Sequence, residues 1–309
     1  MHDTSGLAVR ALTKRYGDHR ALDEMSFEVR PGEVFGFVGS NGAGKTTTMR
    51  IAVGVLDSDG GEVHFKGRPV DAASRARFGY MPEERGLYPK MTVARQLTYL
   101  ARLHGLSRTD AADAMRTWTE RLDVAQHRDH QVDSLSLGNQ QRVQLAAALV
   151  HDPRVLLLDE PFSGLDPLAV DTMSAVLRER AEQGAPVLFS SHQLDLVERL
   201  CDRIGIVRSG SMVACGSAGE LRAGGGEDLY IEIEGAPRDW ARALRGIDSF
   251  RDQGHGTLVR VADDCDEGEL LRHVASLGRL RTFRRQQATL TELFRTYMTD
   301  ADGSTEAAA

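Results

Sequence analysis

A complete phosphate-binding pattern lies near the start of this chain. Its residues are Gly39, Ser40, Asn41, Gly42, Ala43, Gly44, Lys45 and Thr46. An apolar run precedes the pattern and a helical run follows it, as a P-loop requires. Gly42 and Gly44 would let backbone N–H groups turn inward around phosphate oxygens, and Lys45 could reach the β and γ phosphates. Thr46 could bind Mg²⁺ through its hydroxyl. The alternative is a glycine-rich turn without a ligand, but a full match in this context favours the phosphate site.

Two adjacent acids follow a second apolar run. Asp159 and Glu160 come directly after residues 155–158. At the carboxyl end of a parallel strand, both carboxylates would lie at the ligand crevice. Asp159 suits the Mg²⁺ shell, and Glu160 suits a general base for water. Alone, the pair could also be an ordinary strand followed by the acidic first turn of a helix, but the P-loop upstream favours the catalytic interpretation.

The elements that must position these residues follow from apolar periodicity. Segments 7–12 and 25–29 alternate apolar and polar residues, as half-buried antiparallel strands do. Mostly apolar runs occur at 33–38, 155–158 and 187–190. With a helical segment between the last two, these runs favour a parallel sheet covered on both faces. Residues 92–150 have helical spacing and predict a helical subdomain inserted in this domain. A hairpin around 209–211 would close it.

A smaller second domain is predicted beyond the glycine run at 224–226. Three adjacent glycines support neither helix nor strand, so they separate a first domain of residues 1–225 from a small α+β domain of residues 226–300. Its predicted strands are 229–234, 258–261 and 280–283, and its predicted helices are 240–244, 270–277 and 290–298. Residues 301–309 are predicted to be a disordered tail.

The composition disfavours several classes of function. The 309 residues carry a formal net charge of −7 with dispersed basic residues, which argues against nucleic acid as the main partner. Cys201, Cys215 and Cys265 are far apart and indicate neither a disulfide framework nor a zinc site, which fits a reducing cytoplasm. We find no signal-peptide pattern and no run of about 18 apolar residues, so we expect a protein that is neither secreted nor membrane-spanning.

A run shortly before the two acids carries a family resemblance. Residues 135–143, Leu-Ser-Leu-Gly-Asn-Gln-Gln-Arg-Val, resemble the signature sequence of ABC ATPases, whose usual form is Leu-Ser-Gly-Gly-Gln. Residues 163–166, Ser-Gly-Leu-Asp, resemble the family's D-loop, His192 its switch histidine, and Tyr16 the aromatic that stacks on adenine. Alone, Tyr16 would be a packed strand-end aromatic and His192 a cap or a buried hydrogen-bonding group. The order of the markers across residues 7–220 favours the family roles.

The resemblance implies an α/β fold: a P-loop ABC cassette with a mixed sheet, N-terminal antiparallel strands and an inserted helical subdomain, followed by the small α+β domain. It also implies ATP and Mg²⁺ as ligands, with Glu160 as base and His192 at the γ-phosphate. The residues implied for the nucleotide are Tyr16, Gly39, Ser40, Asn41, Gly42, Ala43, Gly44, Lys45, Thr46, Thr47, Ser136, Gly138 and Asp166, and those for Mg²⁺ are Thr46, Asp159 and Glu83. Ser136 could also simply cap a helix, which is compatible with holding phosphate.

Three positions depart from the family pattern. Leu137 replaces the first glycine of the signature and Asn139 replaces its glutamine, so the phosphate contact there is expected to be remodelled or slower. Glu83 stands where the family usually has glutamine; it could bind Mg²⁺ or order water, but it adds negative charge beside a triphosphate. The variant signature, the segment around Glu83 and the C-terminal segment 290–294 resemble those of a bacterial exporter-like subgroup similar to sodium and drug efflux ATPases.

The function implied is that of an ATP-hydrolysing transporter subunit. Two cassettes, expected as a homodimer, would close on ATP and drive transport, expected to be export, through a separate integral membrane permease. The chain would be cytoplasmic and peripheral on the inner face of the cell membrane, held only by the permease. The alternatives are a soluble ABC-type ATPase acting on ribosomes or DNA, and a non-hydrolysing regulatory cassette. The retained Lys45, Asp159 and Glu160 argue against the inactive form.

Overall fold

The computed structural model describes residues 6–84, 86–224, 227–237, 240–243, 247–262, 265–287 and 289–299. The chain divides into two compact units, Met1–Ser217 and Ala218–Ala309. The boundary after Ser217 lies before the boundary near residue 226 that the glycine run predicts. Helix α8 (Ala218–Gly224) contacts α10 (Leu290–Thr299) and therefore belongs to the second unit. Residues 225 and 226 and the predicted tail at 301–309 lie outside the described residues.

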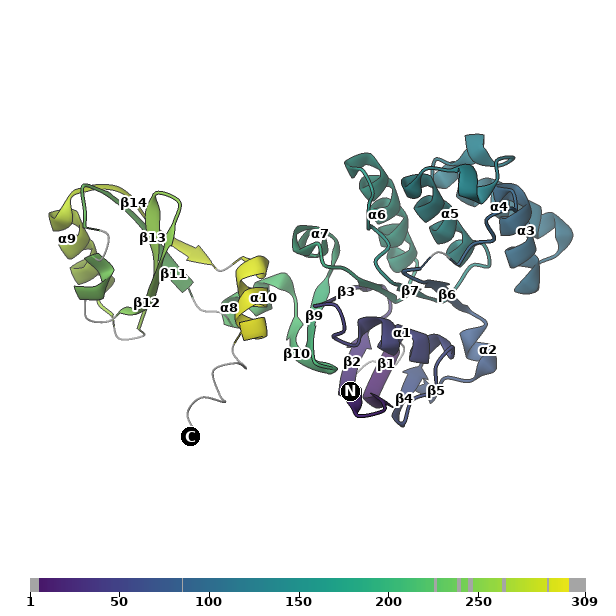
Figure 1. The fold of residues 1–309 in the computed structure, drawn as a ribbon, viewed down its shortest axis with the longest axis horizontal. Coiled ribbons are helices and arrows are strands. Elements are labelled where there is room, and N and C mark those ends of the chain that lie inside the picture. The colour runs from purple at the N-terminus through teal and green to yellow at the C-terminus, as the bar shows by residue number, and fades with distance from the viewer. Residues whose placement is uncertain are drawn as a thin grey trace. The chain divides into compact units, whose positions relative to one another are not determined.

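An antiparallel sheet forms the N-terminal part of the first unit (Figure 1). Its strands are β1 (Leu7–Tyr16), β2 (His19–Val29), β4 (Gly60–Phe65) and β5 (Arg68–Pro69), in the order β2-β1-β4-β5. Leu7 pairs with Val29 in register, and Leu7, Val9 and Leu12 are buried. Ala11, with φ of 46°, lies where the register of β1 shifts, so the apolar side is restored at Leu12. The predicted antiparallel strands are confirmed.

A six-stranded sheet runs beside it. Its order is β10-β9-β3-β8-β7-β6, built from β3 (Val34–Gly39), β6 (Phe78–Met81), β7 (Val155–Leu158), β8 (Val187–Ser190), β9 (Arg203–Arg208) and β10 (Ser211–Gly216). All neighbouring strands are parallel except β9 and β10, which form the predicted hairpin. Every residue of β3, β7 and β8 is buried, as expected for central strands of a sheet covered on both faces.

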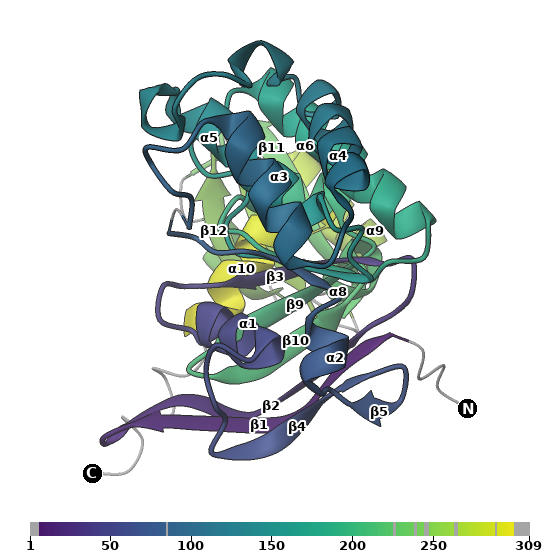
Figure 2. The same cartoon turned by 90° about the vertical axis from the view of Figure 1, so that its right-hand side faces the viewer.

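Helices cover this sheet on both sides (Figures 1 and 2). Helix α1 (Lys45–Val53) packs in the core between the two sheets. The other face is covered by α5 (Leu137–Leu149), α6 (Pro167–Glu182) and α7 (Leu194–Leu200). The predicted helical insertion contains α3 (Val93–Leu103), α4 (Arg108–Arg121) and α5, with short helices η1 (Ala125–His127) and η2 (Val132–Ser134); α2 (Ala72–Arg75) precedes it.

The second unit is a four-stranded antiparallel sheet with helices. Its strands are β11 (Glu227–Glu234), β12 (Ile247–Gln253), β13 (Gly256–Val261) and β14 (Arg279–Gln287), in the order β12-β13-β11-β14. Short helix η3 (Trp240–Ala243) and helix α9 (Glu267–Leu277) share a buried core with the sheet through Trp240, Val259 and Val274. Strand β12 was not predicted. Among the residues described in either unit, no helix has the length and apolar character needed to cross a bilayer.

Candidate functional site

A cleft at the carboxyl ends of β3 and β7, here called the P-loop cleft, brings most of the predicted residues together. Its volume is about 510 Å³. It is lined by Tyr16, His19, Ala21, Asn41, Gly42, Ala43, Gly44, Lys45, Thr46, Thr47, Glu83, Asp159 and Glu160. The predicted residues outside this lining are Gly39, Ser40, Ser136, Gly138, Asp166 and His192. His19 and Ala21 were not predicted, and they reach the cleft because β2 passes beside the loop.

The loop backbone requires glycine at two positions. Gly42 and Gly44 have φ of 81° and 104°, in the region that side chains disfavour. A Cβ on Gly44 would also lie 2.7 Å from the carbonyl oxygen of Ala21. Helix α1 begins at the next residue, and its first turn contains no acid. The positive end of α1 is therefore available to an anion in the cleft.

Lys45 is held at the base of the cleft. Its Nζ donates to the carbonyl oxygens of Gly39 at 2.7 Å and Ser40 at 3.1 Å. These two residues therefore contribute to the site through their backbone. Burial lowers the pKa of Lys45, while the charges of Glu160, Asp159 and, more weakly, Glu83 act in the opposite direction. Among the described residues, the buried ammonium hydrogen-bonds only to these carbonyl oxygens, so it can readily exchange them for phosphate oxygens.

Asp159 offers one carboxylate oxygen for a cation. Its Oδ1 accepts a hydrogen bond from Ser190 Oγ at 2.6 Å, whereas its buried Oδ2 has no hydrogen-bond partner among the residues described. Thr46 lines the same cleft. Within the described part of the chain, no cluster of three or more His, Cys, Asp or Glu could hold a metal. This donor set fits Mg²⁺, which proteins usually bind through one or two carboxylates together with substrate phosphates.

Glu160 is buried but not isolated. Its Oε2 lies 2.9 Å from Nδ1 of His192, and its backbone N–H donates to Ser190 Oγ at 2.8 Å. Burial raises the pKa of Glu160, and His192 and Lys45 partly oppose that rise. Its φ of 49° is uncommon for a non-glycine residue and typical of functional sites. The arrangement suits a general base, because a raised pKa makes the Glu160 carboxylate a better proton acceptor.

The signature segment begins helix α5. Ser136 is its N-cap, and Ser136 Oγ accepts from the N–H of Asn139 at 3.4 Å. Leu137 is 53% exposed, and its Cδ2 lies 3.3 Å from the position that a Cβ on Gly164 would take. The signature and the D-loop therefore adjoin in one chain.

Two glutamines of α5 connect the signature to the cleft. Gln141 Nε2 donates to the carbonyl oxygens of Glu160 at 3.2 Å and Pro161 at 3.1 Å. One turn later, Gln144 Nε2 donates to the carbonyl oxygen of Pro82 at 2.6 Å, next to Glu83. Both glutamines are buried. Helix α5 thus holds the backbone on both sides of the acidic groups, a role that was not predicted.

Asn139 has a side-chain partner outside α5. Its Nδ2 lies 3.0 Å from Nε2 of His127, and Nδ1 of His127 lies 3.1 Å from Nδ1 of His130. If Asn139 donates, His127 carries its proton on Nδ1 and donates in turn to His130. Short helix η1 therefore supports the substituted signature position.

Tyr16 and Asp166 come from different parts of the predicted site. Tyr16 is 51% exposed at the end of β1, where it lines the cleft, and Lys14 Nζ lies 5.9 Å from its ring centroid. Asp166 is the N-cap of α6 and accepts from the N–H of Ala169 at 2.8 Å. In this structure its carboxylate stabilises a helix end, and a direct contact with nucleotide stays a prediction.

Comparison with known proteins agrees with this geometry. The sequence model of the family described as ABC transporter matches residues 22–163, and that of the DrrA1-3-like ATP-binding protein C-terminal domain matches residues 216–298. The uncharacterized ABC transporter ATP-binding protein YhaQ of Bacillus subtilis is 36% identical over 289 residues, which cover 93% of this chain and 97% of YhaQ. The linearmycin resistance ATP-binding protein LnrL of Bacillus subtilis is 30% identical, over 80% of this chain and 81% of LnrL. A solved structure of an ATP binding subunit of an ABC transporter has a TM-score of 0.66 at 30% identity, over 71% of this chain and 92% of that one.

Proposed function

Because the chain belongs to the ATP-binding proteins of ABC transporters, we propose that it hydrolyses ATP to drive export through a separate membrane permease. The observation that carries this proposal is the P-loop cleft. In it, the glycine-rich loop at the start of α1 faces Lys45, Asp159 and Glu160. This combination supplies a phosphate cradle, a cation ligand and a base within one cavity.

We assign each residue a role that its place in or near the cleft supports. Tyr16 stacks on the adenine, and Lys45 exchanges its carbonyl partners for the β and γ phosphates. Thr46 and Asp159 Oδ2 would hold Mg²⁺, which would supply positive charge to the phosphates, and Glu83, in the same cleft lining, would join that shell or order its water. Glu160 accepts the proton of the attacking water, and His192 keeps its carboxylate oriented and ionised.

Two copies of the chain are needed for a complete site. Ser136 and Gly138, at the start of α5, do not line the P-loop cleft of their own chain. We infer that they contact the γ-phosphate bound by a second copy, with the positive end of α5 directed at that anion. ATP then favours the closed pair, and loss of the γ-phosphate contacts favours opening.

The export direction and the membrane partner rest on the relatives. LnrL is named as a resistance protein, and the second unit matches the DrrA-like C-terminal domain. The resistance role in the name of LnrL supports export, and the permease is expected to be a different polypeptide, with this chain on the cytoplasmic face of the membrane. The transported substrate is defined by the permease, because this chain contacts only ATP and the permease.

The proposal is tested by purification of the tagged chain from gently solubilised membranes of its native cell, followed by mass spectrometry. We expect a multi-helix membrane protein to co-purify, and it should be absent from a parallel preparation of untagged cells. Recovery only from the soluble fraction, together with ribosomes or DNA, would contradict the transporter role and favour a soluble ATPase.

A further inference from the structure

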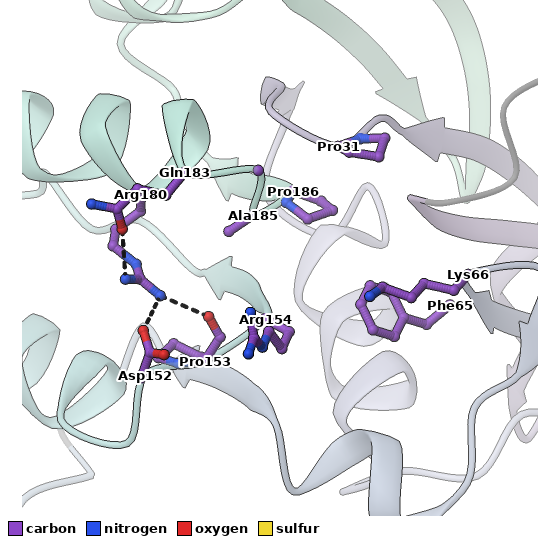
Figure 3. Close-up of a pocket in the computed structure, with 11 residues that line it drawn as sticks. Pro31, Phe65, Lys66, Asp152, Pro153, Arg154, Arg180, Gln183, Ala185 and Pro186 are labelled. Atoms are coloured by element: carbon purple, nitrogen blue, oxygen red, sulfur yellow. Dashed lines mark hydrogen bonds and ion pairs between the residues drawn. The ribbon is translucent and has the colours of Figure 1, made fainter.

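Two adjoining cavities open at the sheet edge opposite to the P-loop cleft. Their volumes are about 390 and 610 Å³, and both are lined by Phe65, Lys66 and Arg154. The smaller one is also lined by Pro31 and Pro186, which lie just before β3 and β8 (Figure 3). Because β3, β7 and β8 are parallel and the P-loop cleft lies at their carboxyl ends, the two cavities form a separate site. We call them the basic cleft.

Cationic side chains dominate this lining. The cations are Lys66, Arg68, Arg77, Arg154 and Arg180, and the acids are Asp71 and Asp152. Asp152 accepts from Arg180 at 2.7 Å, and Asp71 caps α2 by accepting from the N–H of Ser74 at 2.7 Å. The other four cations form no ion pair with any residue that the structure describes. Clustered positive charges repel each other, and an anion bound among them would relieve this repulsion and be attracted to each cation.

Backbone and side-chain contacts both position these cations. Lys66 has φ of 53° in the turn between β4 and β5, a conformation that favours glycine or asparagine. Its Nζ lies 5.5 Å from the ring centroid of Phe65. The N–H of Arg154 donates to the carbonyl oxygen of Arg77 at 2.7 Å, which joins the two arginine-bearing segments. Arg180 is held by three hydrogen bonds in the wall of the cavity (Figure 3).

We propose that the basic cleft binds a phosphate-bearing anion, independently of ATP. Guanidinium groups present paired donors that match phosphate oxygens, and a lysine ammonium adds a point charge. Phe65, Pro31 and Pro186 provide apolar contact for the organic part of such a molecule. The same chemistry is offered by a soluble phosphate ester and by the headgroup of an anionic phospholipid.

Binding can be measured with two probes while ADP saturates the P-loop cleft. Calorimetry with inorganic pyrophosphate represents the soluble phosphate, and flotation with phosphatidylglycerol vesicles, compared with phosphatidylcholine vesicles, represents the lipid headgroup. Arg154→Gln should weaken binding by roughly tenfold or more, as expected for loss of a charge-assisted hydrogen bond. The control is Arg116→Gln on α4, which removes the same charge from a residue paired with Asp113.

The outcomes separate the two sources. Pyrophosphate binding that Arg154→Gln weakens and Arg116→Gln preserves identifies a soluble phosphate ligand, and the same pattern with phosphatidylglycerol vesicles identifies a lipid headgroup. Absence of binding to both probes, or an equal loss in both variants, overturns the proposal. Arg154→Gln should keep the affinity of the wild type for ADP, because Arg154 does not line the P-loop cleft; this result shows that the variant is folded.

Discussion

Glu160 and Lys45 show how burial and charge act together at single residues. Both groups are largely removed from water, and burial alone would disfavour the charged form of each. Each partly compensates the other, because the Lys45 charge lowers the pKa of Glu160 and the Glu160 charge raises the pKa of Lys45. Removal of either neighbour should therefore change the pH dependence of the one that remains.

Replacement of His192 tests this electrostatic coupling. His192 lowers the pKa of Glu160, so His192→Ala should raise that pKa further above its ordinary value. Glu160 would then be protonated at a higher pH, and the acid limb of kcat at saturating Mg²⁺ and ATP should move to higher pH. His192→Gln can keep a hydrogen bond to Glu160 without a charge, so its acid limb should move less than that of His192→Ala. An acid limb at the same pH in all three proteins would show that His192 does not control the base.

Loss of the Lys45 ammonium should mainly affect nucleotide binding. Lys45→Ala removes the cation that we place on the β and γ phosphates, and a hydrogen bond to a charged group contributes about 1.5–3 kcal/mol. ATP affinity, measured by calorimetry, should fall by roughly 10-fold to 100-fold. Lys90→Ala is the control, since Lys90 pairs with Asp133 and does not line the cleft. Equal ATP affinity of Lys45→Ala and the wild type would refute the assignment.

The sequence indicated the contiguous parts of the site but not its supporting contacts. The P-loop and the acids Asp159 and Glu160 are recognisable because each group is adjacent in sequence and follows an apolar strand. Ser190 ends the neighbouring strand at the same edge, so its position beside Asp159 could have been inferred. Gln141 and Gln144 gave no such signal, because their acceptors are carbonyl oxygens brought near only when α5 packs on the sheet.

At the scale of elements, α5 is the part on which the site depends most. The bond between Asn139 and His127 fixes the start of this helix relative to η1. His127→Phe keeps an aromatic ring but removes the acceptor, so kcat should fall several-fold while ATP affinity of the isolated chain stays unchanged. His127→Gln offers an amide acceptor and should recover much of the rate. Wild-type kcat in His127→Phe would show that the bond has no part in positioning the signature.

Close packing of α7 on β3 gives a test of the fold itself. A Cβ on Gly36 would lie 2.6 Å from Val197 Cγ1 and 2.7 Å from Cys201 Sγ. Gly36→Ala should therefore lower the free energy of unfolding, measured with urea, by about 1–3 kcal/mol. Gly219→Ala in α8 meets no atom within 4 Å and should not destabilise the protein. An unchanged urea midpoint for Gly36→Ala would contradict the packing of α7.

The strands that were predicted and the strand that was not differ in their burial. Strands β3, β7 and β8 are central, fully buried and mostly apolar, so their composition alone identified them. Strand β12 lies at a sheet edge and has only Ile247 and Phe250 as apolar residues, which leaves no alternation to detect. Its position is determined by pairing with β13 rather than by its own sequence.

For the whole molecule, the central inference is that one chain contains two separate halves of a catalytic site. The phosphate loop and the base share one cleft, and the start of α5 lies outside its lining. A single copy should therefore bind ATP but hydrolyse it poorly, and activity should increase with the concentration of the chain or with its recruitment by a permease. The second unit folds around its own core.

Sedimentation of the Glu160→Gln variant tests this inference most directly. Without the base, bound ATP cannot be hydrolysed, so the closed pair should accumulate. We predict a dimer with saturating Mg²⁺ and ATP, a monomer with ADP, and a monomer with ATP when Lys45→Ala is added. A Glu160→Gln variant that binds ATP fully and remains monomeric at every concentration would contradict the shared site.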